Sequence, residues 1–152
     1  MTEQEQTDQN FMKLALEQGQ LAYHAGEVPV GAVVVLDGQV IGRGYNKPIT
    51  SLDPSAHAEV VALRDAALNI GNYRLANAVL YVTVEPCTMC SGLLVHSRIA
   101  RLVYGTTEPK SGVIESAMCL LEQPFYNHKI EITGGVLAQE ASTLMSDFFT
   151  MR

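Results

Sequence analysis

The sequence predicts an α/β fold, a three-layer αβα sandwich whose five-stranded mixed sheet carries helices on both faces. Apolar residues recur at helical spacing near each end of the chain, an Asp37-Gly38 pair separates two β-rich runs, and further strands alternate with helices after that pair. The pair is a strong signal for an N-terminal antiparallel hairpin. Alternating strands and helices are typical of a sheet covered on both faces. The 152 residues contain no internal repeat or linker and suit one domain, 1–152.

The first half of the chain places the hairpin between two helices. Phe11, Leu14 and Leu21 belong to a helical apolar stripe that ends near Gly26. The second helix has Ser55 nearby as a candidate N-cap. In order, the expected elements are a helix over 9–24, strands over 29–36 and 39–45, a polar loop over 46–54, and a helix over 57–69.

The second half continues the alternation. The run 78–84 is β-branched and alternates as a buried strand does, and Pro86 is expected to open the next helix at its first turn. A helix between the last two strands would make them parallel through a crossover. The remaining expected elements are a strand over 101–104, a loop over 105–112, a helix over 113–121, a strand over 128–133 and an amphipathic helix between 136 and 148.

The composition is that of an ordinary globular protein, with 47% hydrophobic and 17% charged residues. The first ten residues are polar and acidic, so we expect no signal peptide, and no apolar run reaches the roughly 18–20 residues of a membrane span. Three cysteines, two of them in Cys87-x-x-Cys90, favour metal or thiol chemistry in a reducing compartment over disulfides. We therefore expect a cytoplasmic protein with no membrane partner.

The net charge of −6 argues at first against a nucleic-acid partner. The charge is unevenly distributed, however. Between Arg43 and Lys110 there are seven bases and five acids, whereas the rest of the chain carries three bases and eleven acids. A modest positive face on an acidic body and a mixed, solvated surface both fit this distribution.

Two separated motifs supply side chains that bind metals. Cys87 and Cys90 offer two thiolates after a β-rich run and Pro86, and His57 offers an imidazole upstream. Three such ligands leave the fourth position of a tetrahedral zinc ion open to water, as in catalytic zinc sites. Glu59, two residues after His57, is then placed to move the protons of that water. The combination of H-x-E with P-C-x-x-C is the signature of the zinc deaminases.

Both motifs lie at expected helix starts, which accounts for their spacing. Because side chains tilt toward a helix N-terminus, His57 and Glu59 can both lean over the end of their helix, although positions i and i+2 diverge in mid-helix. Cys87 and Cys90, at i and i+3, share one face of theirs. Two helix N-termini aimed at one point also favour thiolate and hydroxide.

Each motif alone has a simpler interpretation. His57-x-Glu59 is common at ordinary helix starts, and Cys87-x-x-Cys90 also suits a thioredoxin-like redox pair or half of a structural zinc site. A fourth thiolate from Cys119 would close the metal sphere and make it structural. The apolar neighbours of Cys119 predict instead a buried, inert thiol. Together the two motifs favour a deaminase site.

Further short segments with distinctive sequences run through nearly the whole chain. They are EVPVGA at 27–32, NKP at 46–48, DP at 53–54, NYRL at 72–75, LYVT at 80–83, HSRI at 96–99 and DFF at 147–149. On these segments the chain resembles the bacterial tRNA adenosine deaminases. The resemblance implies a cytidine deaminase-like fold, a zinc cofactor, a homodimer, and conversion of the wobble adenosine in a tRNA anticodon loop to inosine.

The same resemblance implies roles for individual residues. Glu59 would be the proton shuttle, and the zinc ligands would be His57, Cys87 and Cys90. Asn46 would orient the flipped nucleoside, and the other substrate-binding residues would be Val30, Pro86 and Glu108. The chain departs from the family pattern where Thr107-Glu108 replaces an Arg and a shorter Asp, and where it stops at Arg152 instead of continuing with a basic tail. Both departures bear on RNA affinity and leave the catalytic residues in place.

Hydrolytic deamination at C6 of adenine is therefore the expected reaction, and two other functions compete with it. A free base or nucleoside deaminase would act on guanine or cytosine compounds with the same zinc chemistry. Parallel last strands occur in guanine deaminases as well, whereas small free-cytidine deaminases join these strands by a hairpin. A non-catalytic zinc module that binds RNA or a partner protein would need a fourth ligand, for which Cys119 is the candidate.

Overall fold

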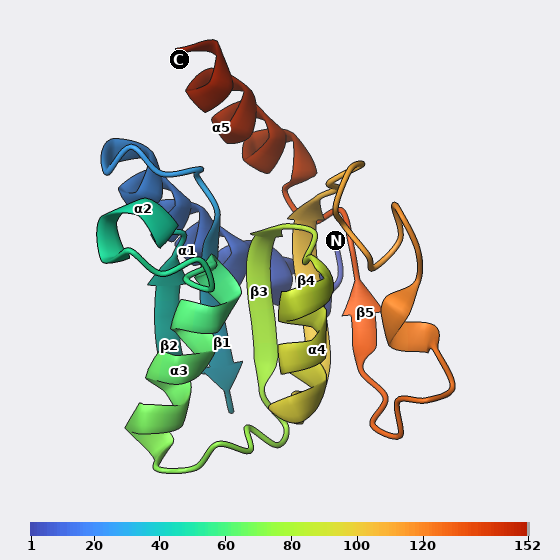
Figure 1. The fold of residues 1–152 in the computed structure, drawn as a ribbon. Coiled ribbons are helices and arrows are strands. Elements are labelled where there is room, and N and C mark those ends of the chain that lie inside the picture. Colours follow the sequence, from blue (N-terminus) through green and yellow to red (C-terminus); the bar gives the residue numbers. More distant parts are fainter. Residues whose placement is uncertain (152) are drawn as a thin grey trace.

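The computed structural model describes residues 1–151 and contains the predicted five-stranded mixed sheet (Figure 1). The strand order is β2-β1-β3-β4-β5. β1 runs antiparallel to both β2 and β3, whereas β3, β4 and β5 run parallel to one another. The strands are β1 (Gly31–Leu36), β2 (Gln39–Tyr45), β3 (Val79–Val84), β4 (Arg101–Thr106) and β5 (Glu131–Thr133).

Helices cover both faces of this sheet, as the sequence predicts. α3 and α4 lie side by side on one face (Figure 1). α1 covers the other face by packing on β1 and β3, and α5 contacts α1 and β4. Within residues 1–151, no helix has the length and apolar character to cross a membrane. The helices are α1 (Glu3–His24), α2 (Pro48–Ser51), α3 (Ala58–Ile70), α4 (Thr88–His96), the 3₁₀ turn η1 (Leu120–Glu122) and α5 (Ala138–Thr150).

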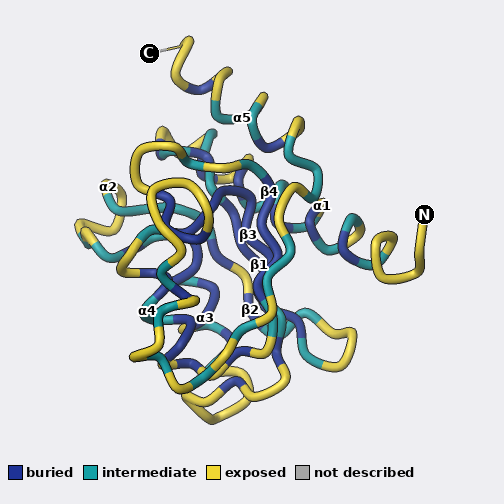
Figure 2. Tube along the Cα trace, turned by 90° about the vertical axis from the view of Figure 1, so that its right-hand side faces the viewer, coloured by how far each residue is buried: buried dark blue, intermediate teal, exposed yellow. Residues whose placement is uncertain are grey.

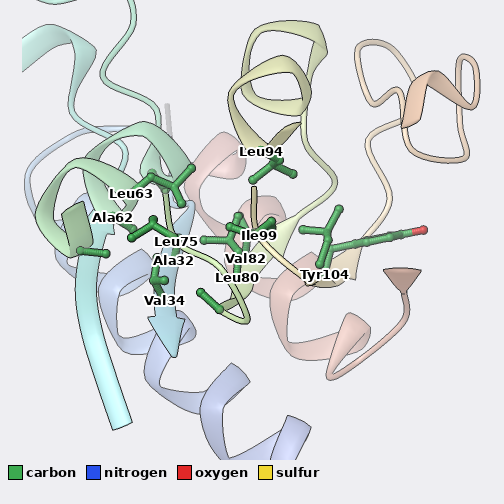
Figure 3. Packing of buried hydrophobic residues seen from close by; sticks show 14 of the residues in the cluster. Ala32, Val34, Ala62, Leu63, Leu75, Leu80, Val82, Leu94, Ile99 and Tyr104 are labelled. Atoms are coloured by element: carbon green, nitrogen blue, oxygen red, sulfur yellow. The ribbon is translucent and has the colours of Figure 1, made fainter. Parts of the chain in front are cut away.

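Alternate residues of each strand fill two apolar cores, one on each side of the sheet. Figure 2 shows the buried residues concentrated along the central strands. Toward α1, Met12 packs with Val33, Val35, Tyr81 and Val103. Toward α3 and α4, the second core holds a larger cluster (Figure 3) that includes Ala32, Val34, Ala62, Leu63, Leu80, Val82, Leu94 and Tyr104.

Two glycines of β2 allow α3 to lie unusually close to the sheet. A Cβ atom at Gly42 would stand 2.4 Å from the carbonyl oxygen of Ala62, and one at Gly44 would stand 2.5 Å from the Ala62 nitrogen. Both distances are too short for any side chain, and the atoms met are backbone atoms that cannot turn aside. The distance between β2 and α3 therefore depends on these two positions.

The hairpin between β1 and β2 forms as predicted. Asp37 and Gly38 both have positive φ, at 51° and 75°, which a type I′ turn requires. α1, in contrast, begins at Glu3 rather than near residue 9. Thr2 and Glu5 form a capping box, in which each side chain accepts a hydrogen bond from the other residue's backbone nitrogen. That cap stabilises two extra turns of polar helix.

Three local predictions are wrong. The polar loop over 46–54 contains the short helix α2. Ser55 does not cap the next helix, because its hydroxyl donates to Asp53 and His57 occupies the N-cap position. Pro86 precedes α4, whose N-cap is Cys87.

The segment 113–121 is also not the helix that the sequence predicts. Its backbone forms turns and leads into η1. The reason lies outside the segment, because the amide groups of Ile114, Glu115 and Ser116 donate to the Glu85 carboxylate instead of to carbonyl groups within a helix. β4 and β5 are nevertheless parallel, as predicted.

A buried ion pair joins α1 to β4. Both carboxylate oxygens of Asp8 accept hydrogen bonds from Arg101, at 2.7 and 2.6 Å, and the Tyr81 hydroxyl donates to Asp8 at 2.9 Å. Burial raises the pKa of Asp8, but the hydrogen bonds from Arg101 and Tyr81 outweigh it and hold that pKa below its ordinary value. The charged form of Asp8 therefore stabilises the fold.

We expect Asp8→Asn to lower the free energy of unfolding at pH 7 by about 3–5 kcal/mol, since it leaves the largely buried Arg101 guanidinium with only the exposed Glu131 carboxylate, 3.9 Å away, as counter-charge. The wild-type advantage is complete above the unfolded-state pKa of about 3.9 and is lost as pH falls through the lower folded-state pKa. Urea titrations between pH 7 and pH 2 measure both effects. Asp37→Asn, at the exposed hairpin turn, is the matched control. An advantage that persists unchanged at pH 2 would contradict the assignment.

Candidate metal centre

Three side chains of the ligand type meet beyond the carboxyl end of the central strand β3, as predicted. His57 is the N-cap of α3, Cys87 is the N-cap of α4, and Cys90 lies in the first turn of α4. The Nδ1 atom of His57 is 3.6 Å from the Cys87 sulfur and 3.5 Å from the Cys90 sulfur. The three ligand atoms all lie within 4.8 Å of one another.

The donor set fits zinc in both chemistry and spacing. Zinc binds thiolate at about 2.3 Å and imidazole at about 2.0–2.1 Å in tetrahedral geometry, which separates neighbouring ligand atoms by about 3.6–3.8 Å. The sulfur–nitrogen distances of 3.6 and 3.5 Å match that separation. Among residues 1–151, Cys119 is not part of the ligand group, and its thiol is exposed, so the prediction of a buried thiol is wrong.

The starts of α3 and α4 provide the electrostatic setting of the group. Neither His57 nor Cys87 makes a side-chain N-cap hydrogen bond to its helix, and the positive end of each helix dipole favours a nearby anion. The hydrogen bond from Cys90 is the main cause that lowers the pKa of Cys87, to about 3. The same contact, together with burial, raises the pKa of Cys90. A thiolate at position 87 is thus favoured.

Glu59 lies in the first turn of α3 with its side chain in the same cavity as His57 and Cys87. Only 4% of its surface is exposed. This burial is the main cause that raises its pKa to about 7. A carboxyl group with a pKa close to neutral is suited to both accept and donate a proton.

The cavity beside the ligand group has a volume of about 190 Å³. Of the four predicted substrate-binding residues, Val30, Asn46 and Glu108 line it. Pro86 is not among the described lining residues, and its carbonyl instead accepts a hydrogen bond from the Val113 nitrogen. A second hollow of about 480 Å³, between the end of β4 and α5, shares Glu108 with the cavity.

Sequence reasoning missed several residues that line the cavity. Met145 lies on α5 and borders both the cavity and the adjoining hollow. The place of Val84 in the lining could have been predicted, because it lies at the carboxyl end of a parallel strand, where ligands usually bind. No sequence signal connects Ser111 to the site, because its place depends on the path of the loop after β4. Val28 also lines the cavity, two residues before the predicted Val30, and the other missed lining residue is Glu85.

Two buried carboxylates hold the walls of the cavity. Glu27, 1% exposed, accepts hydrogen bonds from the Ile49 and Thr50 nitrogens at 3.3 and 2.7 Å. This fixes the turn that follows Asn46. On the other side, Glu85 holds the loop that carries Glu108. Burial raises the pKa of Glu85, but its hydrogen bonds outweigh that effect and hold the pKa below the ordinary value.

Residues 5–106 match the family described as the cytidine and deoxycytidylate deaminase zinc-binding region. The tRNA-specific adenosine deaminase of Haemophilus influenzae is 51% identical over 95% of this chain and 84% of its own. A solved tRNA:A34 deaminase, described for A-to-I editing at the wobble position of transfer RNA, superposes with a TM-score of 0.86 at 42% identity, over 89% of this chain and 98% of its own. Guanine deaminase from Bacillus subtilis superposes with a TM-score of 0.62 at 38% identity, over 70% and 66%.

The exposed position of Cys119 leads to a prediction about metal content. Cys119→Ser is expected to keep one zinc per chain. Cys87→Ser removes a ligand and is expected to weaken zinc binding by more than about 100-fold. That effect exceeds the roughly 10–100-fold loss caused by removing a residue that only hydrogen-bonds to a ligand. Elemental analysis after dialysis against a graded chelator measures both. Loss of zinc from Cys119→Ser would indicate a closed, four-ligand structural site instead.

Proposed function

The chain belongs to the zinc-binding cytidine and deoxycytidylate deaminase family, and from this premise we propose that it is a tRNA adenosine deaminase that converts adenosine to inosine at the wobble position of an anticodon loop. The observation that carries the proposal is the convergence of His57, Cys87 and Cys90 beside Glu59 in one small cavity. Similarity to the tRNA-specific adenosine deaminase of Haemophilus influenzae supports the choice of substrate.

The three ligand residues would hold zinc at one end of the cavity. When bound there, zinc acts as a Lewis acid that lowers the pKa of its water from 15.7 to about 7. Glu59 accepts the proton of the attacking water and delivers it first to the purine ring and then to the leaving amine. Two protons are therefore transferred, because one proton of the water ends on the ring nitrogen and the other on the amine. In the net reaction, water adds its oxygen to C6 of adenine, the C6–N bond breaks, and ammonia leaves.

The cavity suits a single flipped base better than a base pair. Its volume of about 190 Å³ is bordered by the apolar side chains of Val30 and Met145 and by the amide of Asn46. Apolar walls contact the faces of the base, and the amide can bond to its polar atoms. Moving a base out of its stack costs a few kcal/mol, least in a single strand, and anticodon loops present their bases unpaired. The adjoining hollow along α5 gives room for neighbouring nucleotides.

We further propose that the protein works as a homodimer in the reducing cytoplasm, where a site built on free thiols persists. Leu68 and Tyr73 are large apolar residues with 83% and 69% of their surfaces exposed, and both border a hollow of about 550 Å³ at the end of α3. Exposed apolar surface of this kind is typical of an interaction face.

The dimer is tested by sedimentation equilibrium, which should give twice the chain mass of 16.5 kDa. Tyr73→Lys should shift the equilibrium toward monomer by placing a charge in the interface. Lys110→Tyr, which exchanges the same two residue types on a different surface loop, is the control. A wild-type mass of 16.5 kDa at micromolar concentration would contradict the proposal.

The role of Glu59 is tested by Glu59→Ala, which should retain zinc and lower kcat on an anticodon stem-loop by at least about 10²–10⁴-fold, the usual contribution of a positioned acid–base group. Inosine formation is measured by nucleoside chromatography, and Glu122→Ala is the control for loss of an exposed glutamate. Turnover near the wild-type rate would remove Glu59 from the mechanism.

The substrate class is tested separately with the wild-type protein. It should form inosine in the stem-loop and leave free adenosine, cytidine and guanine unchanged. Preferred turnover of guanine would favour the competing free-base function, which the partial similarity to guanine deaminase from Bacillus subtilis makes the relevant alternative.

A further inference from the structure

Glu85 is a buried carboxylate that the proposed chemistry does not use. It follows the end of β3 and comes two residues before the zinc-ligand candidate Cys87. Only 4% of its surface is exposed. Burial of a carboxylate is costly unless strong hydrogen bonds compensate it, so the partners of Glu85 indicate what it is for.

All of the side-chain partners of Glu85 come from one loop. Its Oε2 atom accepts hydrogen bonds from three successive amides, those of Ile114, Glu115 and Ser116, at 2.9, 2.8 and 2.9 Å. Its Oε1 atom accepts from the Glu108 nitrogen at 3.0 Å and from the Ser116 hydroxyl. The loop between residues 107 and 117 thus folds around this carboxylate as backbone amides fold around a bound anion.

Gly112 shows how closely the loop follows the carboxylate. A Cβ atom at this position would stand 2.4 Å from the carboxyl carbon of Glu85 and 2.5 Å from its Oε1 atom. Gly112 does not have the positive φ that would itself call for glycine. The contact with Glu85 and a distance of 2.7 Å to the Glu108 carbonyl oxygen together account for the glycine at this position.

Backbone hydrogen bonds attach the loop to the same short segment. The Glu85 nitrogen donates to the Thr106 carbonyl at 2.9 Å, and the Val113 nitrogen donates to the Pro86 carbonyl at 3.1 Å. The first bond ties residue 85 to the end of β4, just before the loop, and the second ties the loop itself to residue 86. This segment leads directly into Cys87, so the ligand group and the loop share one rigid support.

The loop also forms part of the cavity wall. Glu108 and Ser111 both line the cavity together with His57 and Glu59. Fixing such side chains before the substrate binds removes the entropy cost of ordering them during binding. Glu85 itself borders the cavity, but both of its carboxylate oxygens accept hydrogen bonds from the loop, so it acts on substrate binding through the loop.

We propose that Glu85 is a positioning residue for substrate binding, which fastens the loop 108–116 to the strand end that carries Cys87 and so holds Glu108 and Ser111 at the cavity. The inference rests on the proposed function for the identity of the substrate. The attachment of the loop to Glu85 is independent of the proposed function, because it can be measured without any substrate.

Glu85→Gln tests the proposal, since glutamine keeps the size of the side chain but presents an NH₂ group to one set of donors. We expect KM to rise by about 10–100-fold, as for loss of hydrogen bonds to a charged group, with kcat within about 3-fold and zinc content unchanged. KM is measured on whichever of the stem-loop, guanine or cytidine the wild-type protein turns over, so failure of the proposed function is recognised separately.

Limited trypsin digestion supplies the readout without substrate. Lys110 is exposed in the loop, and cleavage after it requires the loop to open. Mass spectrometry should show at least about 10-fold faster cleavage after Lys110 in Glu85→Gln than in the wild type. The exposed Glu122→Gln is the matched control and should leave both KM and cleavage unchanged.

Gly112→Ala disturbs the same contact from the loop side, and it keeps the test decisive if Glu85→Gln does not fold. It should raise KM and accelerate cleavage in the same way. In the double variant, the increase in KM should fall well short of the product of the two single increases, because both changes break one contact. Wild-type cleavage after Lys110 in the folded variants, or a fall in kcat with KM unchanged, would overturn the proposal.

Discussion

Two helices begin side by side at the carboxyl end of the central strand β3, and the rest of the structure depends on this constraint. The chain passes from α3 into β3 and from β3 into α4. Both helices run antiparallel to this strand, so both begin at its carboxyl end. His57 and Cys87 occupy the two N-cap positions, and Cys90 lies one turn further along α4. The spacing of the ligand atoms therefore follows from the packing of helices on a sheet rather than from a dedicated loop.

The buried glutamates have different roles because their surroundings differ. Glu27 and Glu85 each accept amide hydrogen bonds and hold a wall of the cavity. Glu59 lies beside His57 and the two thiols, and its burial raises its pKa to about 7. One residue type thus serves as a fixed anion at one position and as a proton carrier at another. The difference arises from the number of donors that the backbone provides.

Much of the fold and of the ligand group follows from local sequence pattern. The Asp37-Gly38 turn, the apolar stripe of α1 and the three ligand residues each carry a signal within a few positions. The helix predicted over 113–121 fails for the opposite reason, since its amides are taken by Glu85, 29 to 31 residues away. The places of Ser111 and Met145 likewise depend on tertiary packing. Local propensity contains no information about such distant competitors.

The close approach of β2 and α3 limits which residues can occupy two positions of β2. Gly42 and Gly44 admit no side chain, and α3 begins at the residue that follows His57. Any larger residue at either of these two positions would push the helix outward and carry the imidazole away from the two sulfur atoms. Two positions on an outer strand, neither of which lines the cavity, are thereby coupled to the spacing of the metal ligands.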